Sequence, residues 1–434
     1  MFHRRVRRSL AVLVVTIAMA AVACAPPAEP LATPSPSPQP SPSPTLPIES
    51  PLPTSPLPTP PSPLPSPTPE VESALDRAVA LYAAGTPEDA ILYALRDDGT
   101  PEALGQSVQE WADVSRDGRW FATASSEPPA RSAVALDLQT GTSYTIPVRS
   151  GFDVYGMAFD PEVPRLAFLE LGLPDADPFL WAIIIVDLDD GSTVRLEGPP
   201  DAGNGLLPGN PLGWSGTQLL LGTFVPYTGE TSAGVWSITV PPDVTAGSVE
   251  ELDLREVLSA ESYLFQPEVP PQATRLLYLN RDYDYTPDDY DDFGLDLAVN
   301  QLWLLDVANE SPTLLVEETE GAALGGDVAW SPDGALGLFA VGRYAGRVFE
   351  SLALKTVDSR GTVTDVGPVP LPSEGDLISL DWCTPDTALV VVATAERVHE
   401  LHWMDLATGE SSRIASDNVI NVLRCVRRQG GAAP

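Results

Sequence analysis

The sequence lacks most of the short motifs that mark an enzyme. Only three cysteines and three histidines occur among its 434 residues, without a C-x-x-C pair or an H-E-x-x-H zinc motif. A G-x-S-x-G nucleophile elbow and a glycine-rich phosphate loop are also absent. His399 and His402 lie three apart in a strand-like segment and therefore point to opposite faces. These absences exclude an accompanying serine-hydrolase domain, and they give no support to a histidine metal site.

Basic residues are scarce. The chain has 24 Lys and Arg against 60 Asp and Glu, for a formal net charge of −36. Because like charges repel, we expect no binding to nucleic acid or to an anionic lipid surface. Cationic groups, metal ions and neutral sugars remain open as ligands. The simpler interpretation is that the acidity keeps the protein soluble.

No apolar run is long enough to span a membrane. The longest, Ser9 to Val22, has about 14 residues, whereas a membrane helix needs about 20. Four arginines precede it, and Ala21-Val22-Ala23-Cys24 follows. This pattern resembles the signal peptide and lipobox of bacterial lipoproteins, which implies removal of residues 1–23 and lipidation of Cys24. An ordinary signal peptide followed by a chance cysteine is the alternative.

The segment 24–69 is predicted to be a linker. Of the 47 prolines in the chain, 20 lie between Ala25 and Pro69, interleaved with Ser and Thr. Proline fixes φ and removes the amide donor, so helix and sheet are both excluded. Extended polyproline II at about 3.1 Å per residue would carry a domain roughly 140 Å from the membrane.

A short helix is predicted over 70–87. Apolar residues recur at helical spacing between Val71 and Tyr82, and Gly85 and Pro87 supply stop signals.

From residue 88 to 434 the chain alternates between strand-length apolar runs and Gly, Asp or Pro turns. One recurring unit is an aromatic-ended strand, a turn and an apolar strand, clearest at Trp330-Ser331-Pro332-Asp333-Gly334. Related copies stand at 114–124, 159–169, 214–224, 265–279 and 382–393. A second unit has an Asp-centred turn, as in Leu136-Asp137-Leu138-Gln139-Thr140-Gly141. Both units read as hairpins, because Asp bonds its own backbone and Gly accepts positive φ.

Two hairpins make one four-stranded sheet, and copies of about 45 to 50 residues packed radially form a β-propeller. The repeat resembles that of the TolB-like and PD40 (WD40-like) propellers of bacterial envelope proteins. The fold class expected is therefore all-β, with six or seven blades. Seven are favoured, because Val419–Val426 can close the ring against N-terminal strands, with Ala90–Gly105 as the outer hairpin. A second helix over Asp89–Arg96 is the competing interpretation.

Two cysteines remain once Cys24 is lipidated. Export would place Cys383 and Cys425 where a disulfide can persist, and a bridge between them is a hypothesis.

One insertion stands out between the strands that end at Leu279 and begin at Gln301. Its candidate ligand residues for Ca²⁺, a hard cation that prefers oxygen ligands, are Asp282, Asp284, Asp288, Asp289, Asp291 and Asp292. Its candidate partner contacts are Tyr283, Tyr285 and Tyr290, together with Tyr227 from another long loop. A solvated acidic loop without a ligand, a partner site and a calcium site all remain open.

Three functions compete. The preferred one is a non-catalytic binding module, displayed on a stalk by a lipid-anchored monomer outside the cytoplasm and recognising an envelope protein or glycan. The others are a ligand-free envelope scaffold and a glycan-processing enzyme of the glycosidase or lyase type, which needs only paired carboxylates. No sequence motif selects such a pair.

Overall fold

The computed structural model describes residues 74–86, 89–109, 111–125, 131–173, 180–199, 207–224, 233–245, 247–263, 265–269, 274–280, 299–318, 322–345, 348–369, 376–394, 398–415 and 419–426. They belong to one compact unit, Pro69–Pro434. Within these residues, no helix has the length and apolar character needed to cross a bilayer.

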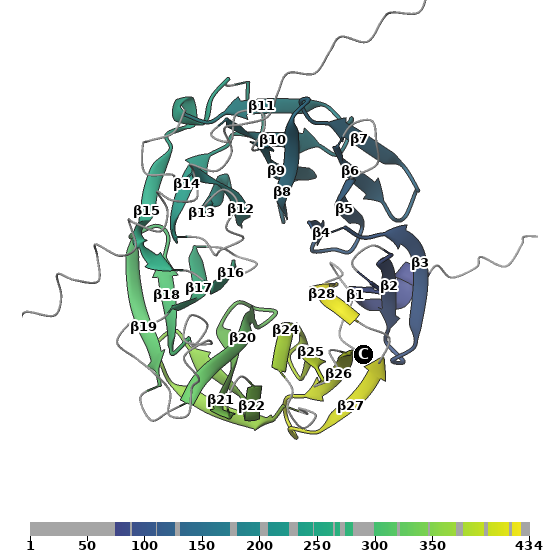
Figure 1. Cartoon of the computed structure of the whole chain (residues 1–434), viewed down its shortest axis with the longest axis vertical. Helices are drawn as coiled ribbons and strands as arrows, with labels where there is room; N and C mark the ends of the chain where they lie inside the picture. The colour runs from purple at the N-terminus through teal and green to yellow at the C-terminus, as the bar shows by residue number, and fades with distance from the viewer. Residues whose placement is uncertain are drawn as a thin grey trace, which may run out of the picture. The chain divides into compact units, whose positions relative to one another are not determined.

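Seven four-stranded antiparallel sheets surround a central axis as the blades of a propeller (Figure 1). From the inner strand outward, the first blade is β28 (Val419–Cys425), β1 (Ala78–Ala84), β2 (Ile91–Arg96) and β3 (Pro101–Ser107). The second is β4 (Ala112–Val114), β5 (Trp120–Ser125), β6 (Ser132–Asp137) and β7 (Ser143–Pro147). The third is β8 (Phe152–Phe159), β9 (Arg165–Gly172), β10 (Trp181–Asp187) and β11 (Thr193–Glu197).

The remaining blades repeat the plan. The fourth is β12 (Leu207–Ser215), β13 (Gln218–Phe224), β14 (Ala233–Thr239) and β15 (Arg255–Tyr263), and the fifth is β16 (Phe265–Glu268), β17 (Arg275–Asn280), β18 (Gln301–Asp306) and β19 (Ser311–Glu317). The sixth is β20 (Ala322–Trp330), β21 (Leu336–Ala345), β22 (Val348–Asp358) and β23 (Val363–Pro368). The seventh is β24 (Asp376–Thr384), β25 (Thr387–Ala393), β26 (His399–Asp405) and β27 (Ser411–Ala415). Short 3₁₀ turns occupy Ala74–Arg77 and Val249–Leu252.

The first blade closes the ring with strands from both ends of the chain, as predicted. β28 pairs antiparallel with β1, with Ala80 opposite Cys425, and β1 pairs in turn with β2. The fold is thus the seven-bladed propeller that the repeat and its family resemblance implied.

The helix predicted over 70–87 is wrong. Within the described part of this segment, Ala74–Arg77 forms a single 3₁₀ turn and Ala78–Ala84 is strand β1. Its residues are buried on both faces, except the half-buried Val79, because β28 and β2 flank it and other blades cover it. The apolar positions that fit a helical stripe therefore belong to a strand that is apolar throughout, and the propeller begins near residue 78 rather than 88. The alternative helix over Asp89–Arg96 is also wrong, since β2 occupies it.

The hydrophobic core lies between blades. Strand β9 is buried along its whole length, Arg165–Gly172, because each of its faces packs against a neighbouring blade. One cluster joins the third blade to the fourth through Trp181 and Trp214. At the ring closure, Cys383 and Cys425 form a disulfide with their Cα atoms 4.8 Å apart, inside the cluster between the seventh and first blades.

Aspartates organise the hairpin turns. The carboxylate of Asp137 accepts hydrogen bonds from the amides of Gln139 (2.9 Å) and Thr140 (3.2 Å), and Gly141 completes the turn at φ 73°. Asp405 holds the corresponding turn of the seventh blade in the same way. In the second to seventh blades, the connection from the inner to the second strand and the connection from the third to the outer strand lie at the same end of the sheet, because all neighbouring strands are antiparallel. We call the surface that these turns form the turn face.

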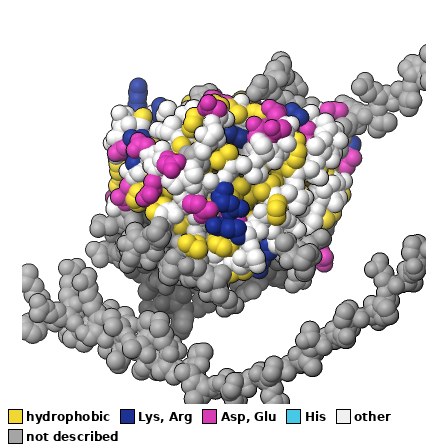
Figure 2. Space-filling view, turned by 90° about the horizontal axis from the view of Figure 1, so that it is seen from above, with side chains coloured by type: hydrophobic (Ala, Val, Ile, Leu, Met, Phe, Trp, Pro, Cys, Tyr) yellow, Lys and Arg dark blue, Asp and Glu magenta, His cyan; other side chains and the backbone are white. Residues whose placement is uncertain are grey.

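Opposite charges are interspersed on the edge of the ring seen in Figure 2, where Lys and Arg side chains lie beside Asp and Glu. A buried example stands in the third blade, where the fully buried Glu170 pairs with both Arg149 (2.8 Å) and Arg195. Burial, and then the charge of Arg149, lower the pKa of Arg195. The buried charge of Glu170 is therefore compensated by two arginines.

Candidate binding site

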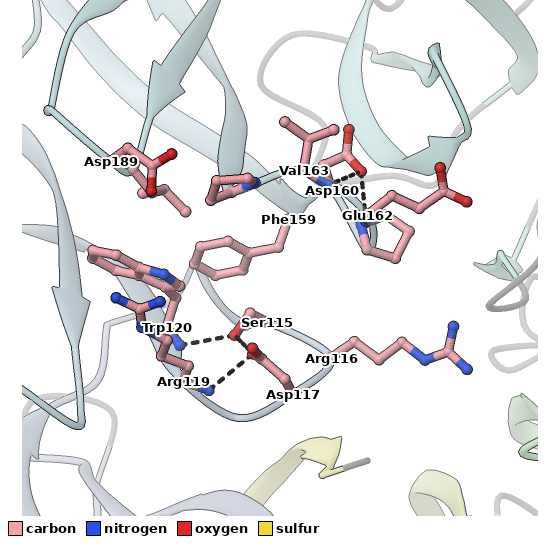
Figure 3. A pocket seen from close by; sticks show the side chains of 13 residues that line it. Ser115, Arg116, Asp117, Arg119, Trp120, Phe159, Asp160, Glu162, Val163 and Asp189 are labelled. Carbon is pink, nitrogen blue, oxygen red and sulfur yellow. Dashed lines mark hydrogen bonds between the residues drawn. The ribbon is translucent and has the colours of Figure 1, made fainter. Parts of the chain in front are cut away.

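A hollow of about 520 Å³ opens on the turn face at the seam between the second and third blades. Its lining comes from three turns: residues 115–120 of the second blade, and residues 159–164 and 188–189 of the third (Figure 3). Trp120 and Phe159 form its aromatic part and are both nearly buried. Charged side chains from both blades stand around them.

The second blade contributes a tightly hydrogen-bonded turn. The Ser115 hydroxyl donates to Asp117 (2.6 Å) and accepts from the Trp120 amide (2.7 Å), which fixes the indole at the start of β5. Gly118 has φ +72°, and a Cβ there would lie 2.7 Å from a methyl group of Val426. The turn is therefore fixed both by its own bonds and by the ring closure.

The third blade contributes a five-residue turn, Asp160 to Pro164. Asp160 accepts hydrogen bonds from the amides of Glu162 (2.8 Å) and Val163 (3.1 Å), and its other oxygen accepts from the buried Arg165 (2.7 Å). Glu162 is exposed at the edge of the hollow, as is Asp189. Both carboxylates face solvent beside an aromatic floor.

One arginine of the lining is already neutralised. Arg119 donates two hydrogen bonds to Asp137, at 2.8 and 3.0 Å, and its guanidinium lies 5.3 Å from the centre of the Trp120 ring. Burial would raise the pKa of Asp137, but the hydrogen bonds from Arg119, Gln139 and Thr140 outweigh it, so that pKa is lowered. The same hydrogen bond to Asp137 raises the pKa of Arg119. This pair stays charged over the physiological range.

The inner strands carry carboxylates that tie neighbouring blades together. Asp327 accepts from the amides of Val328 (2.8 Å) and, across the seam, Leu380 (3.1 Å). Asp381 likewise accepts from Trp382 (2.7 Å) and Cys425 (2.6 Å). Burial, and then the neighbouring Asp381, raise the pKa of Asp327 to about 7.

Asp113 is a third inner-strand tie and also pairs with a cation. It accepts from the amides of Val114 (2.8 Å) and Phe159 (3.1 Å) and from Arg424 at 2.9 Å. Every oxygen of Asp113, Asp327 and Asp381 thus accepts a main-chain amide, which is the bonding of a structural group.

Most of the residues predicted from sequence cannot be compared with this site. The six candidate aspartates, Tyr283, Tyr285 and Tyr290 of the insertion, Tyr227 and Cys24 all lie outside the described residues. His399 contacts the Val419 carbonyl at 2.9 Å, and His402 contacts Glu400 at 3.1 Å, so the two histidines have separate partners. Among the described residues, no group of three or more His, Cys, Asp or Glu side chains is placed to hold a metal ion.

Comparison with known sequences finds no relative. No family model matches the chain, and no curated protein sequence is similar to it. Solved structures do resemble it. A puromycin hydrolase matches with TM-score 0.52 and 18% identity over 80% of this chain, and oligogalacturonate lyase from Vibrio parahaemolyticus matches with TM-score 0.53 and 12% identity over 75% of it. TolB from Acinetobacter baumannii matches with TM-score 0.41 and 14% identity over 69% of this chain and 65% of its own.

These matches describe an architecture. The chain is a seven-bladed β-propeller. It spans 56% of the length of the puromycin hydrolase and 85% of the lyase, at identities that show the fold alone. The activities named for those proteins therefore belong to them.

Sequence reasoning missed the hollow, because it is formed by two blades. The one available signal was the turn between β8 and β9. Its sequence Asp160-Pro161-Glu162-Val163-Pro164 departs from the Ser-Pro-Asp-Gly pattern, and it places an acidic side chain and two prolines at the seam.

Proposed function

We propose that this chain is an exported, lipid-anchored β-propeller that binds a partner protein, and that the hollow between the second and third blades is its binding site. The observation that carries the proposal is the hollow itself. It joins an aromatic floor, Trp120 and Phe159, to the exposed carboxylates Glu162 and Asp189. A hollow that combines aromatic side chains with charged groups at its edge offers both apolar contact and charge complementarity to a partner side chain.

Export is supported by the amino-terminal sequence and by the disulfide. The basic start, the short apolar run and Cys24 have the order of a lipoprotein signal. A disulfide between Cys383 and Cys425 persists in oxidising compartments outside the cytoplasm. The Pro-rich segment 24–69 would then hold the propeller away from the membrane.

Binding is favoured over carboxylate chemistry by the state of the inner carboxylates. A glycosidase or lyase needs one carboxyl group free to move a proton and a second free to act as base or nucleophile. Asp327 and Asp381 interact electrostatically and are candidates for such a pair, but their oxygens accept main-chain amides at 2.6–3.1 Å. Those bonds fit a role in joining blades.

The test is affinity capture from detergent-solubilised envelope with the full chain as bait. A second bait carries Glu162→Gln and Asp189→Asn. A control bait carries Asp386→Asn and Glu410→Gln, which remove the same two charges from the turn face of the seventh blade. A stoichiometric protein kept by the control and lost from the second bait supports the proposal. The absence of any partner from all baits contradicts it, and recovery of a glycan would instead favour a lectin-like role.

A further inference from the structure

The neighbouring seam shows what fills the equivalent position elsewhere in the ring. Between the third and fourth blades, the Arg165 guanidinium lies 4.2 Å from the centre of the Trp214 ring. Its Nη1 donates to the carbonyls of Val240 (3.2 Å) and Pro241 (3.3 Å), and its Nε donates to Asp160 (2.7 Å). An aromatic ring, two turn carbonyls and a carboxylate thus enclose one buried cation.

In the hollow, the third blade supplies residues that correspond to those that the fourth blade supplies around Arg165. Phe159 corresponds to Trp214, because each pairs with the second residue of the next strand, Leu166 and Leu219. The turn residues correspond as well. The Leu188 amide bonds to the Pro164 carbonyl, just as the Val240 amide bonds to the Thr217 carbonyl. Leu188 and Asp189 therefore stand where Val240 and Pro241 hold the guanidinium, and both line the hollow.

The cation itself is missing from this seam. Trp120 is the residue of the second blade that corresponds to Arg165. Trp120 begins β5 and pairs with the turn aspartate Asp137, just as Arg165 begins β9 and pairs with Asp187. Ser115 takes the place of Asp160 before the turn. The nearby Arg119 does not replace the cation, because its guanidinium is bonded to Asp137.

Two carboxylates make the hollow beside the Trp120 side chain electronegative. Glu162 and Asp189 are exposed at its edge, and the charge of Asp189 contributes to raising the pKa of the neighbouring Arg119. Arg116 also lines the hollow, but it points away from the aromatic pair (Figure 3). The net charge of −36 adds a long-range attraction for cations.

We propose that the hollow binds an arginine side chain of the partner protein, as the neighbouring seam binds Arg165. The guanidinium stacks on Phe159 and is paired by Glu162 and Asp189. Arginine suits this site better than lysine, because its planar group stacks on a ring while donating in fixed directions at its edge. This inference rests on the proposed function and specifies the chemistry of the partner.

The experiment is isothermal titration of the full chain with N-acetyl-arginine methylamide. The citrulline analogue, which has the same shape without the charge, and the lysine analogue are titrated in parallel. We expect binding of the arginine compound, at least tenfold weaker binding of lysine and no binding of citrulline. Glu162→Gln with Asp189→Asn should weaken arginine binding at least tenfold, and the control pair Asp386→Asn with Glu410→Gln should change it less than twofold.

A second variant tests the occupant directly. Ser115→Asp with Trp120→Arg rebuilds the Asp160–Arg165 arrangement in the hollow, so the chain supplies its own guanidinium and binding should be lost. Equal binding of arginine and citrulline, or unchanged binding in the Glu162 and Asp189 variant, overturns the inference. A captured partner that free arginine amide does not displace also overturns it, while leaving the proposed function intact. Arginine binding at the hollow without any captured partner upholds the inference and contradicts the proposed function.

Discussion

Removing Arg165 should destabilise the propeller more than any change to an exposed arginine. The Arg165 side chain is 5% exposed, and that of its partner Asp160 is fully buried. Arg165→Met would leave the Asp160 charge buried without its cation, which costs about 3–5 kcal/mol, and would also remove a stacking contact of about 1 kcal/mol on Trp214. We expect the free energy of unfolding to fall by about 4–6 kcal/mol.

The second blade suggests a substitution that removes the unpaired charge of Asp160. It has Ser115 at the position of Asp160, and this hydroxyl also holds a turn. In the double variant Arg165→Met with Asp160→Ser, no buried charge is left, so the loss should shrink to about 1–2 kcal/mol. Adding Asp160→Ser to Arg165→Met should therefore restore at least about 2 kcal/mol of the lost stability.

The assay is urea unfolding of the full chain, followed by tryptophan fluorescence. Arg360→Met is the matched control, because Arg360 is exposed on a turn of the sixth blade and should change stability by less than about 0.5 kcal/mol. Two results would refute the assignment of Arg165 as the cation that stabilises this seam. One is a loss of stability for Arg165→Met as small as that for Arg360→Met, and the other is a loss that does not decrease when Asp160→Ser is added.

Three further predictions follow from other parts of the ring. The pKa of Asp327 is raised to about 7 in the folded protein, so the folded state favours the protonated carboxyl. As the pH rises from about 4 to 8, the free energy of unfolding of the wild type should fall by on the order of 3 kcal/mol relative to that of Asp327→Asn. Parallel curves of stability against pH for the two proteins would contradict this. The disulfide between Cys383 and Cys425 spans 42 residues, so a thiol titration of unfolded, unreduced protein should find neither cysteine free, and replacing both by serine should cost about 4 kcal/mol. A Cβ at Gly141 meets no atom within 4 Å, so Gly141→Ala should cost about 1 kcal/mol for its positive φ alone. Gly118→Ala also clashes with Val426, just after β28, and should cost more in thermal melts of the two variants. Equal costs would show that the ring closure is loosely packed at Gly118.

The sequence by itself determined the repeat and most of its local structure. The turns at Asp137 and Ser331 could be predicted because a short polar side chain bonds to amides two to five residues away, whatever lies beyond. The strand at Val419–Cys425 could be assigned to the ring closure because a propeller needs a partner for its first blade. The turn sequence and the blade repeat both depend on information that is local in the chain.

Tertiary structure decided what local patterns left open. Ala78–Ala84 is compatible with helix or strand by composition, and pairing on both edges made it a strand. The hollow depends on which side chain each of two blades sends into one seam. Where Arg165 meets Trp214 the seam is filled, and where Trp120 meets Phe159 a hollow remains. These pairs come together only because separate sheets pack face to face. The spacing between the residues in the sequence therefore does not predict their contact.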